Sequence, residues 1–226
     1  MPSESTNLIS DSGNFRIANR SSNLRANIFL VECILVLAIY VTAVYTQLES
    51  PHQTHLLIAF GVIYMIRLNL MSRWILKREL AIEEVTFVIL IWLPGIMASF
   101  VFFSKEVSNI QLVVSIAVYV LGSYLNSWSE IERKIWKEDT QNKGRCYTLG
   151  LFSLSRNINY FGDTLLFTGW ALAAGNWSNM WAPITMGLLF YFYHIPDKET
   201  YLETRYADDW PAYKKSTPHS FIPFIC

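Results

Sequence analysis

Three polar side chains lie where an apolar stretch begins in the second half of the chain. Arg156, Asn159 and Asp163 belong to the segment RNINYFGD, which leads directly into a hydrophobic run. If a helix begins near Asn157, Asn159 and Asp163 are one turn apart and place an amide and a carboxylate on one face. Such a pair can hold a ribose or an amide group, and a carboxylate in an apolar span indicates a functional site by default. The structural alternative is a cap at Asn157 or Asn159, with Asp163 paired to Arg156.

A glycine lies between the amide and the carboxylate. Gly162 has no side chain, so it allows either a ligand or a neighbouring helix to approach the backbone closely. The sequence alone leaves both possibilities open.

Two cations precede this segment. Arg133 and Lys137 lie in a stretch that reads as the continuation of an apolar helix. Because they are four residues apart, they share one helical face and could bind a phosphate. A basic cluster that only contacts lipid headgroups would show the same pattern.

The C-terminal tail carries charged and aromatic residues at helical spacing. Glu199, Glu203 and Tyr206 follow one helical face, and Trp210 and Tyr213 add flat rings beside basic side chains. A tail of this kind could close over a cofactor, or it could lie on a membrane surface.

The composition indicates which environment surrounds these residues. The chain has 226 residues, of which 52% are hydrophobic and 15% aromatic, which is too apolar for an ordinary soluble domain. Its 18 basic and 18 acidic residues cancel, so no nucleic-acid partner is indicated. The three cysteines have neither paired nor metal-ligand spacing, so we predict no disulfide framework and no metal site.

Six apolar runs are candidates to cross roughly 30 Å of hydrocarbon, a distance that takes about 20 helical residues. They cover residues 28–47, 55–74, 85–103, 110–128, 161–174 and 180–194. The last two are short and fit a tilted hairpin or a re-entrant pair. Basic residues gather before the first run, after the second and fourth, and in the tail, so both termini are predicted to be cytosolic. We therefore expect an all-α, polytopic transmembrane helix bundle with about six spans.

These spans divide the chain into three expected parts. Residues 1–27 form a polar cytosolic tail, residues 28–128 a four-span bundle, and residues 129–226 a cofactor-binding region with a short hairpin and a cytosolic tail. Glu32 and Arg67 are charged residues inside the spans, where charged groups tend to pair or to face a cavity. A pair between these two is one possibility. The expected partner is the lipid bilayer, of the endoplasmic reticulum in a eukaryote or of the inner membrane in a bacterium, and the oligomeric state stays open.

The polar segments resemble the conserved segments of a membrane superfamily. The run from Arg156 to Asp163 resembles its Arg-His-x-Asn-Tyr-x-Gly-Asp/Glu signature, and the stretch from Asn126 to Lys137 is similar to the Asn-Ser-Gln-Lys-x-x-Phe-Arg stretch of sterol reductases. The tail looks like the closing segment of the same proteins, and the match covers about residues 120–226. The superfamily includes the sterol reductases, the steroid 5-alpha-reductase C-terminal region, the DUF1295 proteins and, more distantly, the isoprenylcysteine carboxyl methyltransferases.

The resemblance implies an integral membrane reductase that uses NADPH to reduce a carbon–carbon double bond in a sterol, steroid or other lipid. The residues that it assigns to the cofactor are Arg133, Lys137, Arg156, Asn159, Tyr160, Asp163, Glu199, Arg205, Tyr206 and Tyr213. Arg133 and Lys137 would contact phosphates. The proton donor is not identified; Tyr124, Tyr160 and Glu32 are candidates that the sequence does not rank.

Two departures from the reductase pattern keep alternatives open. Asn157 replaces the usual histidine, and the segment from Thr148 to Phe152 differs from the sterol reductases' Ser-Gly-Trp-Trp-Gly. The chain length is closer to the DUF1295 and methyltransferase branches, so an S-adenosylmethionine-dependent lipid or isoprenylcysteine carboxyl methyltransferase is the alternative. Asn159 and Asp163 favour the reductase, because the methyltransferase signature lacks the following acid. A non-enzymatic protein with a decayed pocket is the third possibility.

Overall fold

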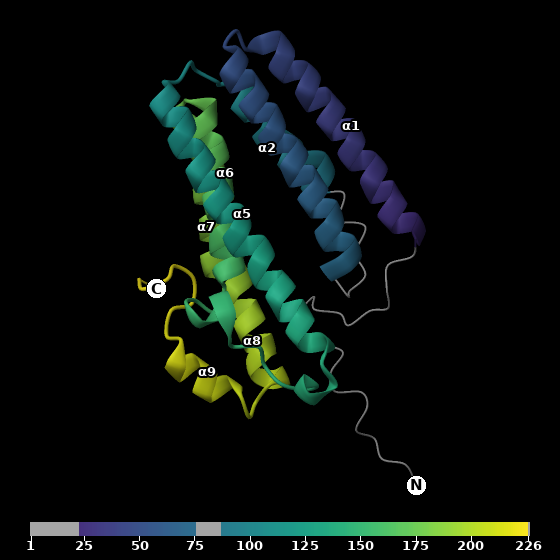
Figure 1. Ribbon diagram of the computed structural model, residues 1–226, viewed down its shortest axis with the longest axis vertical. Coiled ribbons are helices and arrows are strands. Elements are labelled where there is room, and N and C mark those ends of the chain that lie inside the picture. Colours follow the sequence, from purple (N-terminus) through teal and green to yellow (C-terminus); the bar gives the residue numbers. More distant parts are fainter. Residues whose placement is uncertain (1–22, 76–86, 226) are drawn as a thin grey trace.

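The computed structural model describes residues 23–75 and 87–225, which are helical with no strand among them (Figure 1). The α-helices are α1 (Asn23–Gln47), α2 (Pro51–Leu70), α4 (Leu93–Phe102), α5 (Asn109–Glu138), α6 (Ile158–Ala174), α7 (Trp181–Leu189), α8 (Ile195–Arg205) and α9 (Trp210–Ser216). Short π-helical segments extend three of them: Met71–Ile75 follows α2, Phe87–Trp92 precedes α4, and Phe190–His194 joins α7 to α8. The prediction of an all-α fold is confirmed.

Three of the described helical stretches are long and apolar enough to cross a membrane. They are Asn27–Gln47, Pro51–Ile75 and Asn109–Glu138, and Val88–Phe102 is a shorter apolar helix. Helix α6 has 17 residues and α7 has nine, which matches the expected short final runs. The count of about six spans, the cytosolic termini and the three-part division stay predictions. The polar tail up to residue 22 and the start of the third run lie outside the described residues.

The helices form two groups that contact each other through aromatic side chains. Helices α1 and α2 lie side by side in one group, and α5, α6 and α7 form the other (Figure 1). The Phe60 ring of α2 stacks on the Tyr119 ring of α5 with their centres 3.8 Å apart. Trp170 of α6 is fully buried and donates a hydrogen bond of 3.1 Å from Nε1 to the Tyr40 hydroxyl of α1. These contacts fix α2 against α5 and α1 against α6. Helices α5 and α6 carry several of the predicted site residues.

Glycines bring α5 and α6 into backbone contact. A Cβ added at Gly162 would lie 2.5 Å from the backbone nitrogen of Asn126, and one at Gly122 would lie 2.3 Å from that of Leu166. Real Cβ atoms do not approach so closely, so only glycine permits this helix spacing. Of the two possibilities that the sequence left for Gly162, the structure shows the approach of a neighbouring helix.

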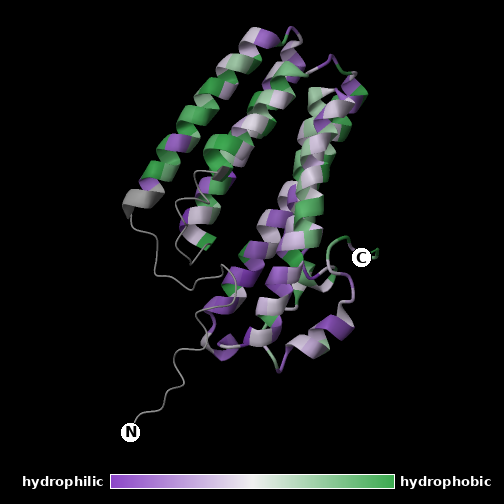
Figure 2. Ribbon diagram, turned by 180° about the vertical axis from the view of Figure 1, so that it is seen from behind, coloured by the Kyte–Doolittle hydropathy of each residue, from purple (hydrophilic) through white to green (hydrophobic). Residues whose placement is uncertain are grey.

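Polar residues gather at one end of the bundle. We define the polar end as the last turns of α5, the first turn of α6, α8, α9 and the segment after α9; Figure 2 shows this region rich in hydrophilic residues. Helix α6 begins at Ile158, three residues before the predicted span, so Asn159 lies within its first turn. Asn157 occupies the N-cap position, but its side chain makes no capping hydrogen bond. The capping role that was considered for Asn157 is therefore wrong.

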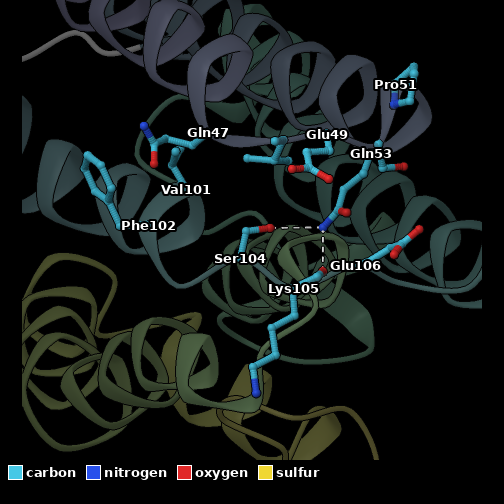
Figure 3. A pocket seen from close by; sticks show the side chains of 11 residues that line it. Gln47, Glu49, Pro51, Gln53, Val101, Phe102, Ser104, Lys105 and Glu106 are labelled. Atoms are coloured by element: carbon cyan, nitrogen blue, oxygen red, sulfur yellow. Dashed lines mark hydrogen bonds between the residues drawn. The ribbon is translucent and has the colours of Figure 1, made fainter.

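The opposite end of the bundle carries a pocket between the α1–α2 and α4–α5 connections. Its lining includes Glu49, Gln53 and Glu106 but none of the predicted cofactor residues (Figure 3). The Gln53 amide nitrogen donates hydrogen bonds of 3.0 Å to the Ser104 hydroxyl and 2.9 Å to the Lys105 carbonyl oxygen (Figure 3). Gln53 thus fastens α2 to the neighbouring connection, and the predicted chemistry lies elsewhere.

Candidate functional site

Asp163 forms an ion pair with a residue of the first helix group. Its Oδ1 lies 2.7 Å from Nη2 of Arg67 on α2, and Nη1 of the same guanidinium donates to the Asn126 side-chain oxygen on α5. Arg67 therefore pairs with Asp163 rather than with Glu32. Asp163 in turn pairs with Arg67 rather than with Arg156. Both of the pairings that the sequence suggested are wrong.

A hydrogen-bond network connects this pair to the polar end. The Asn126 amide donates to the Asn159 carbonyl oxygen at 2.9 Å, and the Asn159 amide donates to Oε1 of Glu130 at 3.0 Å. Oε2 of Glu130 accepts hydrogen bonds from Nη2 and Nε of Arg133 at 2.6 and 3.0 Å. Three predicted residues, Asp163, Asn159 and Arg133, therefore belong to one continuous network between α5 and α6.

Lys198 of α8 lies against this network. Its Nζ is 3.5 Å from Oδ1 of Asn159 and 4.7 Å from the centre of the Tyr160 ring. Burial lowers the pKa of Lys198 to about 8; Glu130 acts in the opposite direction, and Arg133 adds to the lowering. Within the described parts of the chain, Lys198 has no salt bridge. A cation without its own carboxylate favours an anionic ligand.

Lys137 extends the group of cations. Its Nζ donates a hydrogen bond of 3.0 Å to the Tyr206 hydroxyl and another to the Arg145 carbonyl oxygen. Burial raises the pKa of the Cys146 thiol to about 11, and the positive charges of Lys137, Arg133 and Lys198 all oppose this rise. Hydrogen bonds also link Lys198 to Arg133 through Asn159 and Glu130. We call Arg133, Lys137 and Lys198 the cationic cluster.

Arg156 has a different environment. It is only 7% exposed, and its guanidinium holds both oxygens of Glu199, with Nε–Oε1 at 2.8 Å and Nη2–Oε2 at 3.1 Å. Nη1 donates to the carbonyl oxygens of Thr217 and Pro218 at 2.6 and 2.9 Å. The guanidinium therefore holds α8 through two hydrogen bonds to Glu199, and the segment after α9 through two hydrogen bonds to carbonyl oxygens.

Neighbouring side chains complete this attachment. Asn157 is fully buried, and its amide donates to Oε1 of Glu199 at 3.3 Å and to the Ser220 carbonyl oxygen at 2.8 Å. The Ser155 hydroxyl donates to the Phe221 carbonyl oxygen at 2.8 Å. We call Arg156, Asn157, Glu199 and residues 217–221 the tail clasp. The asparagine that replaces the superfamily's histidine thus fastens the tail.

The ten predicted residues fall into separate environments. Arg133, Lys137, Asn159, Tyr160, Asp163 and Tyr206 lie in the network or beside the cationic cluster, whereas Arg156 and Glu199 lie in the tail clasp. Tyr213 is buried and donates to the Phe152 carbonyl oxygen at 2.8 Å. Arg205 is exposed at the end of α8. Their contact with a cofactor stays a prediction.

Sequence reasoning missed two residues of this site and the partner of a third. Glu130 and Lys198 resembled other charged residues near the membrane boundary, and no local spacing marked them. Arg67 was recognised as a charge within an apolar run, but its partner lies 96 positions away. For Arg67, the signal in the sequence was a charged residue within an apolar run.

Membrane-length apolar helices with a charged network at one end define a helical membrane protein whose candidate site lies at the polar end. The chain belongs to the DUF1295 family, described as proteins of unknown function, because residues 80–217 match the family's model. The matched region begins before α4 and contains the cationic cluster, the network apart from Arg67, and half of the tail clasp.

The chain is similar to relatives with two different activities. The chain is 39% identical to a probable O-methyltransferase of Ustilaginoidea virens over 71 residues, which are 31% of this chain and 25% of that protein. It is 29% identical over 91 residues to the Delta(14)-sterol reductase of Candida albicans and 30% identical over 91 residues to that of Schizosaccharomyces pombe. The matches cover 38% of this chain and 19% and 20% of those reductases. The chain thus spans a quarter or less of these relatives.

Proposed function

We propose that the protein is an integral membrane reductase that uses NADPH to reduce a carbon–carbon double bond in a sterol, steroid or other lipid. The similarity to two Delta(14)-sterol reductases supports a reductase. In the orientation that the basic residues predict, the polar end faces the cytosol, where NADPH is dissolved. The membrane would be the endoplasmic reticulum in a eukaryote or the inner membrane in a bacterium.

The cationic cluster carries this proposal. NADPH is a polyanion, whereas S-adenosylmethionine has a positive sulfonium and a single carboxylate. Among the described residues, Glu130 is the one carboxylate that forms a salt bridge with any of the three cations, so the cluster suits several phosphate oxygens better than a single carboxylate. Asn159 and Tyr160 lie directly beside Lys198 and offer an amide and a ring face. The residues present therefore fit NADPH.

The roles of the chain's own residues follow from this arrangement. When bound, NADPH supplies a hydride to one carbon of the double bond. Arg133, Lys137 and Lys198 bind phosphate oxygens, and Asn159 orients the bound molecule. A side chain must give a proton to the neighbouring carbon, and Tyr160 is the one candidate donor that lies beside the cationic cluster.

Replacing Lys198 with methionine is expected to weaken NADPH binding by about tenfold or more, because one charge-assisted hydrogen bond contributes about 1.5–3 kcal/mol. Isothermal titration calorimetry of the full chain in detergent measures the dissociation constant for NADPH. Lys215→Met is the matched control, since Lys215 is exposed on α9 and carries the same charge. An unchanged dissociation constant for Lys198→Met would remove Lys198 from the site.

The same lysine predicts a pH dependence. Its pKa of about 8 means that Lys198 is protonated at neutral pH and loses its charge as the pH rises through that value. NADPH affinity is therefore expected to fall between about pH 7 and pH 9. Lys198→Arg keeps the charge over this range, so its affinity should stay level. A wild-type affinity that is also level would contradict the assignment.

One observation favours a second function. The 39% identity to a probable O-methyltransferase is higher than the identity to either reductase, although it covers fewer residues. An S-adenosylmethionine-dependent lipid or isoprenylcysteine carboxyl methyltransferase is therefore the alternative, and it predicts binding of that cofactor at the same polar end.

A further inference from the structure

One nitrogen of the Arg67 guanidinium has no hydrogen-bond partner among the described residues. Nη2 binds Asp163 at 2.7 Å and Nη1 binds Asn126, but Nε is buried and makes no hydrogen bond to any described residue. In a guanidinium, the Nε hydrogen and one Nη2 hydrogen point from the same edge. The vacant Nε donor therefore belongs to a guanidinium edge that also includes Nη2, the nitrogen bonded to Asp163. A buried donor costs free energy unless a ligand or a water satisfies it.

The carboxylate bonded to Nη2 has a second oxygen that can accept a hydrogen bond. The bond from Arg67 uses Oδ1 of Asp163, and no bond to Oδ2 is found among the described residues. The Asp163 side chain is 23% exposed, against 11% for Arg67. The ion pair is thus mostly enclosed, with its carboxylate partly open. One donor and one acceptor therefore remain on the two members of a single ion pair within the helix bundle.

Other unpartnered polar atoms lie on the surrounding helices. Oε2 of Glu32 on α1, Oδ1 of Asn69 on α2 and the Ser123 hydroxyl on α5 are buried and have no hydrogen-bond partner in the described structure. Arg67 and Asn69 are close to the end of α2 that is linked to the polar end through Asn126. Several unmet polar groups in an apolar bundle indicate a ligand that brings its own polar atom.

The charge of the pair selects the ligand. Arg67 and Asp163 neutralise each other, so a charged ligand would add an uncompensated charge to an apolar region, at a large cost. A ketone could accept a hydrogen bond from Nε but could not donate one to the carboxylate. A hydrocarbon could neither accept nor donate a hydrogen bond. A hydroxyl group accepts from Nε and donates to the carboxylate. It satisfies both vacant positions at once.

We propose that Arg67 and Asp163 bind the hydroxyl group of an apolar alcohol that enters from the bilayer. The inference rests on the proposed function in one respect, that the substrate is a lipid. It does not depend on the proposed reaction or cofactor. It names the part of the lipid that is recognised and the two side chains that recognise it.

A photoreactive sterol tests this assignment on the purified full chain in detergent. The probe carries a diazirine and one hydroxyl, and its labelling of the protein is measured by mass spectrometry. Cholesterol, which has a hydroxyl, and cholestane, which has none, are added as competitors. Because a site built to bind a hydroxyl rejects the analogue without it, cholesterol should compete at about tenfold lower concentration or better. Labelled peptides are expected from α2, α5 or α6.

Two variants attribute this preference to Arg67. Arg67→Met removes the guanidinium but leaves Asp163 without its partner, which endangers folding. Arg67→Lys keeps the positive charge and removes the vacant Nε donor, so it should fold and lose the preference for cholesterol. Arg73→Met is the control, because Arg73 is an exposed cation just beyond the same helix. Its preference should match that of the wild type.

The outcomes separate this inference from the proposed function. Equal competition by cholesterol and cholestane in the wild type, or a full preference in a folded Arg67→Lys variant, would overturn the inference. If NADPH displaces the probe and cholesterol does not, Arg67 and Asp163 bind a ribose hydroxyl of the cofactor rather than an alcohol. That result would also overturn the inference. Each preparation is titrated with NADPH in parallel. Absent NADPH binding with an intact cholesterol preference would remove the proposed cofactor and support the alcohol site.

Discussion

Replacing Arg156 with alanine is expected to lower the free energy of unfolding by about 3–5 kcal/mol and to release the C-terminal tail. The substitution removes four hydrogen bonds and leaves the Glu199 carboxylate, 15% exposed, without its cation. Buried charges that lose their partner are among the most destabilising changes in proteins. Thermal unfolding in detergent measures the loss of stability.

Limited proteolysis measures the release of the tail. Phe221 is buried in the native protein, so chymotrypsin should cleave beside it much faster in Arg156→Ala than in the wild type. Arg205→Ala is the control, because Arg205 is exposed and the substitution removes the same side chain. If both variants are cleaved at the wild-type rate, the tail clasp does not depend on Arg156.

The Gly162→Ala substitution is the second change with a large expected effect. The new methyl group would lie 2.5 Å from the backbone nitrogen of Asn126, and backbone cannot rotate away as a side chain can. Helices α5 and α6 must separate, and overpacking of this kind typically costs about 1–3 kcal/mol. The separation would also displace Asn159 and Asp163, which lie on the same face of α6. NADPH binding should therefore weaken together with stability.

Gly95→Ala provides a matched control within the same protein. A Cβ added to Gly95 of α4 has nothing within 4 Å, and alanine favours a helix by up to about 1 kcal/mol over glycine. Its midpoint of thermal unfolding should be equal to or higher than that of the wild type. Equal midpoints for the two variants would show that α5 and α6 are not in backbone contact at Gly162.

The helical class of the fold could be predicted from the sequence because apolar runs of membrane length are a local signal. Helix α6 begins at Ile158, in polar residues before the apolar run. Helix α5 continues to Glu138, which confirms the predicted continuation of the fourth run through Arg133 and Lys137. Hydropathy marks where a helix meets lipid, whereas hydrogen bonding decides where the helix begins and ends.

The pairing of the charged residues could not be predicted in the same way. Arg67 meets Asp163 because α2, α5 and α6 pack at a particular depth, which glycine contacts and aromatic stacking determine. Spacing correctly placed Asn159 and Asp163 in one polar network. It gave no sign that Arg156 would bind carbonyl oxygens of the tail, since a carbonyl oxygen belongs to every residue.

The cationic cluster could also be predicted only in part from the sequence. Arg133 and Lys137 were recognised because they are one turn apart on a single helix. Lys198 comes from α8 and reaches them only through the fold of the polar end. A residue contributed by a distant helix carries no local pattern, although it adds the third cation on which the proposed cofactor depends.

The most direct test of the proposed function is a parallel titration of the purified full chain with NADPH and with S-adenosylmethionine in detergent. The cationic cluster predicts saturable binding of NADPH, weakened in Lys198→Met and unchanged in Lys215→Met, with no saturable binding of S-adenosylmethionine. Saturable binding of S-adenosylmethionine without binding of NADPH would contradict the reductase and establish the methyltransferase alternative.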